Sequence, residues 1–339
     1  MTDTHASAKN GTTALIIGVD VGGTKVSVAT LRGGELGKPA LHPTDLTSSD
    51  HVVAQIVGAV HDAAAGEEIA AVGIGLPSVI EFATGRVRSS VNIPLQDVPL
   101  RHVLEGELGV PVYVDNDATV AALAEAHDEH GRLDVDNLVM LTIGTGVGGG
   151  IVIGGRPYRG ATGAAAELGH TLIGIGHDIP PAIEHFPQSG SLEALAAGHE
   201  LDRLTRAAAG ENPDSAIGAV LAATGKVAGP DTVKAAQAGD AVAIGLLELL
   251  GRRVGIAVAN VINTFDPDVV AIGGGVSAAG ELLLAPARQV AWGYVLPGVG
   301  TKTEIRLARS GPQAGVRGAA LLARSELAQT DTHYAKAAQ

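Results

Sequence analysis

Three glycine-rich segments contain the residue types that bind phosphate through the backbone. Each follows an apolar run of strand length: Gly22-Gly23-Thr24-Lys25, Gly144-Thr145-Gly146 and Gly273-Gly274-Gly275. Glycine has no Cβ, so the N–H groups of such a turn can approach phosphate oxygens closely. The hydroxyls of Thr24 and Thr145 and the ammonium group of Lys25 could add donors. One such turn could be an ordinary hairpin, but three at strand ends favour phosphate binding.

The middle segment also has the glycine spacing of a dinucleotide-binding fingerprint, at Gly144, Gly146 and Gly149. That fingerprint must open a helix. Residues 150–153 are apolar and rich in β-branched side chains, which is typical of a strand. We therefore expect a strand, a glycine-rich turn and a return strand at this position, with the turn available for phosphate.

Asp20 ends the first apolar run, beside the first of these turns. A carboxylate next to bound phosphates requires a cation, and Mg²⁺ is the usual partner of ATP phosphates. We therefore predict that Asp20 holds Mg²⁺ through a water ligand. The alternative is structural, because aspartate side chains often accept hydrogen bonds from the backbone of a turn.

A polar triplet, Asp115-Asn116-Asp117, lies between a predicted strand and a predicted helix. One of the three could be the N-cap of that helix. In the functional interpretation, Asp117 is a general base that takes a proton from a sugar hydroxyl as it attacks the γ-phosphate of ATP. Asn116 could then hydrogen-bond sugar hydroxyls. The local sequence leaves both interpretations open.

Glu167 and His170 place a carboxylate and an imidazole three residues apart. Both groups are good hydrogen-bond partners for sugar hydroxyls. His170 alone does not indicate a metal site, because zinc sites commonly use at least three protein ligands.

Composition excludes several classes of protein. Hydrophobic residues make up 46% of the 339 residues but aromatic residues only 2%, so the core must consist of small aliphatic side chains. The net charge of −13 opposes non-specific nucleic-acid binding. The absence of cysteine excludes disulfides and thiolate metal sites and fits a cytoplasmic location. No apolar run reaches the roughly 18 residues of a membrane span, so we expect no membrane partner.

Apolar patterning predicts the elements that position these residues. Strands are expected at residues 14–20, 25–31, 69–75, 110–114, 137–143, 150–153 and 269–272. Helices are expected at residues 52–60, 99–108, 118–127, 192–199, 241–262, 278–290 and 313–327. Residues 1–13 are expected to be a disordered leader, and residues 174–190 an irregular loop. The strand–turn–strand units at Gly22 and Gly144 each begin a block of strands and helices, which predicts two domains of similar plan around a cleft.

At this point the ordered set of motifs resembles the ROK family (repressors, open reading frames and kinases), and within it the bacterial glucokinases. The resemblance covers roughly residues 14–325. The motifs are Asp20-Val-Gly-Gly-Thr-Lys25, Gly75-Leu-Pro77, Asn92-Ile-Pro94, Asn116-Asp117, Ile143-Gly-Thr-Gly-Val-Gly-Gly149, Glu167-Leu-Gly-His170, Leu192-Glu193-Ala194 and Ile272-Gly-Gly-Gly-Val-Ser277.

The resemblance implies an actin-like ATPase fold (ribonuclease H-like), with two α/β domains around a cleft. Residues 14–116 plus 313–330 would form the smaller domain, and residues 117–312 the larger one. The implied reaction, a step of glycolysis, transfers phosphate from ATP to D-glucose and gives glucose 6-phosphate. Asp117 resembles the family's catalytic base. Its sugar ligands correspond to Asn92, Asn116, Glu167, His170 and Glu193, together with Asp117.

The resemblance also assigns the nucleotide contacts. Gly22 to Lys25 and Gly144 to Gly146 would bind the ATP phosphates, and Gly273 to Gly275 would lie near the adenosine. Members of the family commonly form dimers or tetramers, so a homo-oligomer is expected.

One departure from the family is large. Members commonly hold a structural zinc with three cysteines and the histidine of the Glu-x-Gly-His motif. The three cysteine positions fall here at Glu184, Phe186 and Ser191. We therefore expect no structural zinc. A nitrogen and oxygen site could in principle be rebuilt with His170 from the nearby residues His177, Asp178, Glu184 and His185.

Other functions remain open on the sequence alone. A second departure, Ser78 in place of the family's usual glycine, lies in the implied sugar pocket. Another hexose such as mannose, N-acetylglucosamine, fructose or allose could fit the same ligands, and polyphosphate could replace ATP as donor. A non-catalytic sugar-sensing regulator is a further alternative. Regulators of the family carry an N-terminal DNA-binding domain, whereas about 13 residues precede the first predicted strand.

Overall fold

The computed structural model describes residues 14–90, 92–174 and 185–337. The chain divides into two compact units, which are described separately. The first unit consists of Met1–Val120, His127–Arg132 and Gln313–Gln339, and the second of Ala121–Ala126 and Leu133–Pro312. The domain boundaries derived from the sequence stay a prediction. The leader expected at residues 1–13 lies outside the described residues, as does most of the loop expected at 174–190.

The first unit contains a six-stranded sheet in the order β3-β2-β1-β5-β8, with β4 also paired to β2. Its strands are β1 (Leu15–Val21), β2 (Lys25–Arg32), β3 (Glu35–Leu36), β4 (Ala40–Pro43), β5 (Ile69–Leu76) and β8 (Val112–Asn116). β1, β5 and β8 are parallel, and β2 is antiparallel to β1. Asp20 pairs with Gly75, and Gly75 pairs with Asp115. Both acidic residues therefore lie near the carboxyl ends of the parallel strands, at the same end of the sheet.

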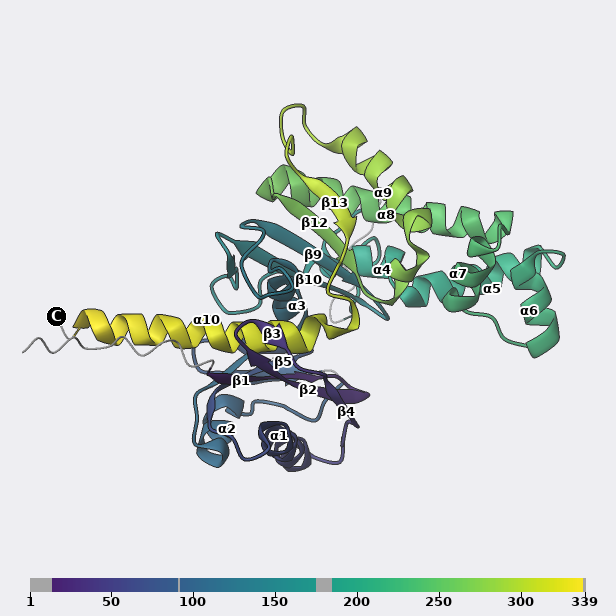
Figure 1. Ribbon diagram of the computed structural model, residues 1–339. Helices are drawn as coiled ribbons and strands as arrows, with labels where there is room; N and C mark the ends of the chain where they lie inside the picture. Colours follow the sequence, from purple (N-terminus) through teal and green to yellow (C-terminus); the bar gives the residue numbers. More distant parts are fainter. Residues whose placement is uncertain (1–13, 91, 175–184, 338–339) are drawn as a thin grey trace, which may run out of the picture. The chain divides into compact units, whose positions relative to one another are not determined.

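Helices cover both faces of this sheet (Figure 1). On one face lie α1 (Ser49–Ala64) and α2 (Leu100–Leu108), and on the other lies α10 (Ala314–Ala337). The N-cap of α1 is Ser48, whose Oγ accepts a hydrogen bond from the N–H of His51. Val52, Ile56 and Val60 follow at helical spacing and are fully buried against the sheet. The helix α3 (Asp117–Glu125) follows β8 directly, so the strand end and the helix start share one short polar segment.

The second unit repeats the same strand plan. Its sheet has the order β11-β10-β9-β12-β13, in which β9 is antiparallel to β10 and parallel to β12. The strands are β9 (Leu138–Ile143), β10 (Val147–Ile153), β11 (Arg156–Pro157), β12 (Val269–Gly273) and β13 (Glu304–Leu307). Each unit therefore has a central strand with an antiparallel partner on one side and two parallel strands on the other. The similar plan predicted from the repeated strand–turn–strand units is confirmed.

Six α-helices in the described part of the second unit complete it. They are α4 (Leu192–Ala196), α5 (Gly198–Glu211), α6 (Ala216–Thr224), α7 (Gly229–Gln237), α8 (Ala241–Phe265) and α9 (Glu281–Tyr294). α8 is the central helix of this core, with Leu247, Val254 and Ile262 fully buried. None of the helices in the described part of the chain has the length and apolar character that a bilayer crossing requires.

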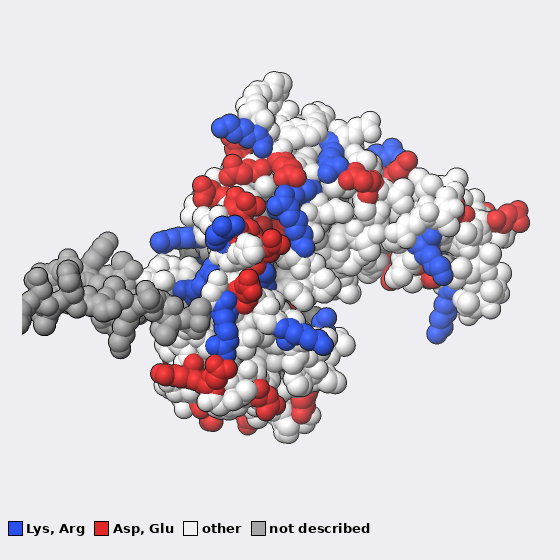
Figure 2. All heavy atoms as spheres, viewed as in Figure 1, with Lys and Arg blue, Asp and Glu red and all other residues white. Residues whose placement is uncertain are grey.

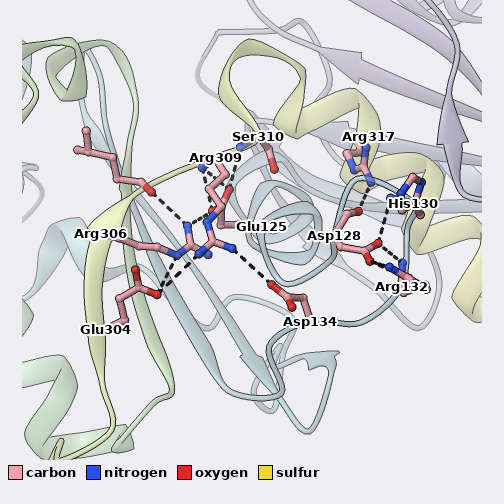
Figure 3. Close-up of polar contacts among 11 residues, drawn as sticks. Glu125, Asp128, His130, Arg132, Asp134, Glu304, Arg306, Arg309, Ser310 and Arg317 are labelled. Carbon is pink, nitrogen blue, oxygen red and sulfur yellow. Dashed lines mark hydrogen bonds and ion pairs between the residues drawn. The ribbon is translucent and has the colours of Figure 1, made fainter.

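A buried ion pair between Glu125 and Arg306 holds the last segment of the second unit in place (Figure 3). The side chain of Glu125, at the end of α3, is fully buried and accepts a hydrogen bond from Arg306 of β13. Its two oxygens also accept the backbone N–H of Arg309, at 2.9 Å each, and that of Ser310, at 3.0 Å. One carboxylate thus fixes the segment between β13 and the short helix η3 (Gly311–Gln313).

Several predicted elements differ from the observed ones. β10 begins at Val147 rather than residue 150, so Gly148 and Gly149 are strand residues and the turn is only 144–146. The helix expected at 192–199 is two helices, because Ala197 has extended backbone angles. The helix expected at 278–290 starts at Glu281, after the 3-10 helix η2 (Gly275–Ala279). The hairpin of β6 (Ser78–Glu81) and β7 (Arg86–Ser90), and the helices α6 and α7, were not predicted.

Candidate functional site

The first glycine turn is a tight connection between β1 and β2. The N–H of Gly22 donates to the carbonyl of Lys25 at 2.9 Å, and Thr44 of the segment after β4 donates to the carbonyl of Gly22 at 2.6 Å. Asn92 lies directly against the turn, 3.1 Å from the position a Cβ on Gly23 would take. Asn92, Thr24 and Lys25 therefore gather around one turn, where Asn92 and Lys25 are exposed.

Asp20, at the end of β1, has a strongly perturbed carboxyl group. Burial, followed by the nearby charge of Asp117, raises the pKa of Asp20 from 3.8 to about 6, and Lys25 opposes this shift. Among the described residues, no hydrogen-bond donor or ion-pair partner satisfies its carboxylate. The structural alternative, in which Asp20 caps the turn, is therefore not what this carboxylate does. The neighbouring carboxylates of Asp20 and Asp117 supply oxygen ligands of the kind that a divalent cation such as Mg²⁺ prefers.

Asn116 and Asp117 have distinct positions at the start of α3. Asn116 is the capping residue, since its Oδ1 accepts the N–H groups of Ala118 at 2.9 Å and Thr119 at 3.2 Å. Its Nδ2 donates to the carbonyl of Ser78 at 3.3 Å. Asp117 is the first residue of the helix, where the peptide dipoles favour a negative charge. The capping interpretation holds for Asn116, while Oδ1 of Asp117 accepts the N–H of Ala118 at 2.8 Å and the charge of Asp117 acts on Asp20.

Ser78 itself has an unusual environment. The residue is buried, and its hydroxyl has no hydrogen-bond partner among the described residues. Its carbonyl, by contrast, holds the Asn116 side chain. The departure noted at this position therefore adds an unsatisfied polar atom beside a proposed sugar ligand.

The second glycine turn is anchored from two sides. Gly146 packs closely against the Glu193 side chain, because a Cβ on Gly146 would lie 3.2 Å from Cδ of Glu193. Oε2 of Glu193 accepts the N–H of Val147 at 2.7 Å. At the start of α5, Gly198 donates to the carbonyl of Gly144 at 2.7 Å, and Nδ1 of His199 lies 3.0 Å from the carbonyl of Thr145. Glu193, a predicted sugar ligand, is thus hydrogen-bonded at the end of a predicted phosphate turn.

A cavity of about 690 Å³ opens beside this turn within the second unit. Gly144, Thr145 and Gly275 line it, which brings two of the three predicted glycine segments to one space. Polar side chains of α5 and α7 complete the lining: His199, Asp202, Lys234 and Gln237. Sequence reasoning missed these four residues, because they carry no motif and only the helix packing brings them together.

Glu167 and His170 lie on the 3-10 helix η1 (Leu168–His170) and its entry. Both side chains are exposed, with 4.0 Å between Oε2 of Glu167 and Nε2 of His170. Gly169 is packed against β10, since a Cβ there would lie 3.1 Å from the carbonyl carbon of Val147. Glu167, His170 and Glu193 are therefore all attached to the strand that begins at the second glycine turn.

Two of the three positions that align with the family's zinc cysteines, Phe186 and Ser191, have other contacts. Phe186 meets the ring of His170 edge-on, with 5.6 Å between centroids and 83° between planes. The hydroxyl of Ser191 is buried and caps α4 by accepting the N–H of Ala194. In the described part of the chain no three histidine, aspartate or glutamate side chains cluster as a metal site would need. His177, Asp178 and Glu184 lie outside the described residues.

The chain is similar in sequence and structure to known proteins along nearly its whole length. The ROK family model matches residues 16–326. A glucokinase of Halalkalibacterium halodurans is 35% identical over 317 residues, which cover 91% of this chain and 95% of that protein. A crystal structure of a ROK family glucokinase from Streptomyces griseus, in complex with glucose and AMPPNP, has a TM-score of 0.75 and 32% identity, covering 92% of this chain and all of that one.

A ROK hexokinase from Thermus thermophilus is similar to the same extent, with a TM-score of 0.73 and 34% identity over 93% of this chain and 99% of that chain. These neighbours confirm the expected fold class, the actin-like ATPase fold with two α/β units. The matches span nearly the full length of both partners.

Proposed function

The chain belongs to the ROK family, and on that premise we propose that it is a glucokinase, which converts ATP and D-glucose to ADP and glucose 6-phosphate. It is a sugar phosphotransferase, as its full-length similarity to glucokinases indicates. The single observation that supports the chemistry best is the acidic pair Asp20 and Asp117, in which the nearby charge of Asp117 helps to raise the pKa of the buried Asp20. One carboxylate can serve the nucleotide and the other the acceptor hydroxyl.

We assign the proton transfer to Asp117. As the sugar hydroxyl oxygen bonds to the γ-phosphorus, the bond from that phosphorus to the β–γ bridging oxygen breaks. The hydroxyl proton passes to the Asp117 carboxylate, which the start of α3 holds in place. Asp20 would hold Mg²⁺ through water, and the bound ion would neutralise charge on the phosphates. Its carboxylate fits that ion, because no donor among the described residues competes for it.

The substrate contacts are proposals of the same kind. Asn92, Asn116, Glu167, His170 and Glu193 would bind the sugar hydroxyls, as the family resemblance implies. Gly22 to Lys25 and Gly144 to Gly146 would bind the phosphates of ATP, with Gly273 to Gly275 near the adenosine. The cavity lined by Thr145, Gly275 and the polar residues of α5 and α7 has the size and mixed chemistry that a nucleoside needs.

A hexose panel tests this proposal. ADP release is measured with glucose, mannose, N-acetylglucosamine, fructose and allose, and sugar phosphate formation is measured with polyphosphate in place of ATP. We expect the highest kcat/KM with glucose and ATP. A higher kcat/KM with another hexose would show that the protein is a kinase for that hexose rather than a glucokinase. Folded protein that binds glucose but turns over no sugar would support the sensing alternative instead.

Assembly and location are further proposals. We infer a homodimer or homotetramer and a cytoplasmic enzyme, in line with the family resemblance and with ATP as substrate. The net charge of −13 argues against nucleic acid as a partner. Figure 2 shows Lys and Arg mixed with Asp and Glu over the face in view, without a continuous basic surface there.

A further inference from the structure

The first turns of α10 contain two glycines on one face of the helix. Gly315 and Gly318 are three residues apart, so their Cα atoms lie on the same side. Each glycine destabilises a helix interior by about 1 kcal/mol relative to alanine. Two of them near one end of a helix therefore need a reason in the packing.

Gly315 lies directly against the carboxylate of Asp20. A Cβ on Gly315 would be 2.5 Å from Cγ of Asp20 and closer still to Oδ2. Ordinary van der Waals contact begins at about 3.4 Å, so the carboxylate would have to move by roughly 1 Å. The bare backbone of α10 is thus one wall of the space that Asp20 occupies. That wall also contributes to the burial that raises the pKa of Asp20.

Gly318 makes the corresponding contact with α3. A Cβ on Gly318 would overlap the backbone carbonyl of Val120, three residues after Asp117 on the same helix. A backbone carbonyl cannot rotate away as a side chain can. The separation of α10 and α3 therefore sets where the start of α3, and with it Asp117, can lie.

The same helix is seated tightly on the sheet that carries Asp20. Cβ atoms built on Gly18 of β1 and Gly73 of β5 would lie 2.8 Å from the N of Ala320 and 2.6 Å from the carbonyl carbon of Ala319. On the other side, Arg317 and Arg324 donate to the carbonyls of Asp128 and Gly131 (Figure 3 shows the first of these contacts). α10 therefore packs with its backbone close to β1 and β5 and is held to residues 128–131 by two arginine side chains, so it cannot shift without breaking these contacts.

We propose that α10 is the positioning element of the reaction, with Gly315 and Gly318 as the residues that set the separation of the Asp20 and Asp117 carboxylates. The inference rests on the proposed kinase function. Gly315 touches no substrate and acts through Asp20, so it is a positioning residue. Displacement of a reacting group by about 1 Å can cost about 10²-fold in rate.

The test compares Gly315→Ala with Gly58→Ala. Gly58 is a helical glycine of α1 with nothing within 4 Å of its Cβ position, so it controls for the gain in helix propensity. We expect Gly315→Ala to lower kcat by about 10–100-fold and to raise the Mg²⁺ concentration for half-maximal rate. The KM for glucose should stay within about twofold of the wild-type value. A general loss of structure would change it by more. Gly58→Ala should behave as wild type. A kcat of Gly315→Ala within about twofold of wild type would overturn the inference.

A stability cycle tests the same contact without activity. If Gly315→Ala is destabilised or unfolded, Asp20→Ala should restore stability in the double variant, because it removes the atoms that the new methyl group meets. A double variant as unstable as Gly315→Ala alone would show that the methyl group meets something else, and the inference would fail. Absence of turnover in the wild type would refute the proposed function, whereas this cycle would still decide whether Asp20 fills the space at Gly315.

Discussion

At the scale of single residues, Asp20 links electrostatics, stability and function. Its folded-state pKa of about 6 lies above the ordinary 3.8, so between pH 4 and 6 the folded state binds more protons than the unfolded state. Stability from this group is therefore fully present below pH 4 and is lost as the pH rises through 6. At neutral pH the charged carboxylate destabilises the metal-free protein, and a bound cation would offset that cost.

Asp20→Asn should therefore stabilise the protein while it impairs turnover. The difference between 3.8 and about 6 corresponds to at most about 3 kcal/mol, and partial solvent exposure reduces the expected gain to about 1–2 kcal/mol at pH 8 without Mg²⁺. The gain should vanish near pH 4. Urea denaturation at several pH values measures it, with the exposed Asp62→Asn as control. A variant that is no more stable than wild type at pH 8 would show that the Asp20 carboxylate is not under electrostatic stress.

His170 offers a second test at this scale. An edge-on aromatic contact is worth about 0.5–1.5 kcal/mol, and the ring of Phe186, itself 70% exposed, makes such a contact with His170. We expect Phe186→Ala to raise the KM for glucose about two- to tenfold with little change in kcat, because the proposed base is untouched. Phe186→Tyr should keep the wild-type KM.

The exposed Tyr294→Ala is the matched control for Phe186→Ala. An unchanged KM in Phe186→Ala would exclude a role for the ring contact in sugar binding. Metal analysis of the purified protein belongs to the same experiment, since stoichiometric zinc would contradict the prediction that the family's structural zinc is lost.

At the scale of elements, the clearest stabilising feature is the buried network in which Glu125 binds Arg306 and the backbone N–H groups of Arg309 and Ser310. Removing one partner of a buried ion pair leaves the other charge buried and unsatisfied, at a cost of about 3–5 kcal/mol. We therefore expect Glu125→Ala to lower the free energy of unfolding by about that amount. Arg309→Ala should cost less than about 1 kcal/mol, because the side-chain pair of Arg309 and Asp134 is exposed. Denaturant titration separates the two, and a loss below about 1 kcal/mol in Glu125→Ala would contradict the buried network.

The same elements show what the sequence can and cannot predict. The glycine turns, Asp20 and Asp117 could be found because each is a local pattern at the end of an apolar strand. Glu125 and Arg306 could not, since 181 residues separate them and neither sits in a motif. The four polar residues that line the cavity lie on α5 and α7, where amphipathic alanine-rich sequence gives no local signal. The early start of β10 was missed because glycines in a strand look like turn residues unless the packing partner is known.

At the scale of the whole molecule, one strand plan is used twice for two related tasks. In each unit the turn between the central strand and its antiparallel neighbour is the glycine-rich segment assigned to phosphates. In the first unit Asp20 lies near the carboxyl end of β1 and Asp117 directly follows β8, whereas in the second unit Glu193 of α4 and Gly169 of η1 contact Val147, the first residue of β10. Within each unit, residues that we propose as phosphate or hydroxyl ligands therefore lie at or beside strand ends.

We propose that this chain transfers phosphate from ATP to glucose with Asp117 as the base. The most direct test measures turnover and glucose binding together, in the wild type and in Asp117→Asn. We predict turnover in the wild type, a loss of about 10²–10⁴-fold in kcat for the variant, and glucose binding that calorimetry still detects in both. Turnover in Asp117→Asn close to that of the wild type would show that Asp117 is not the base.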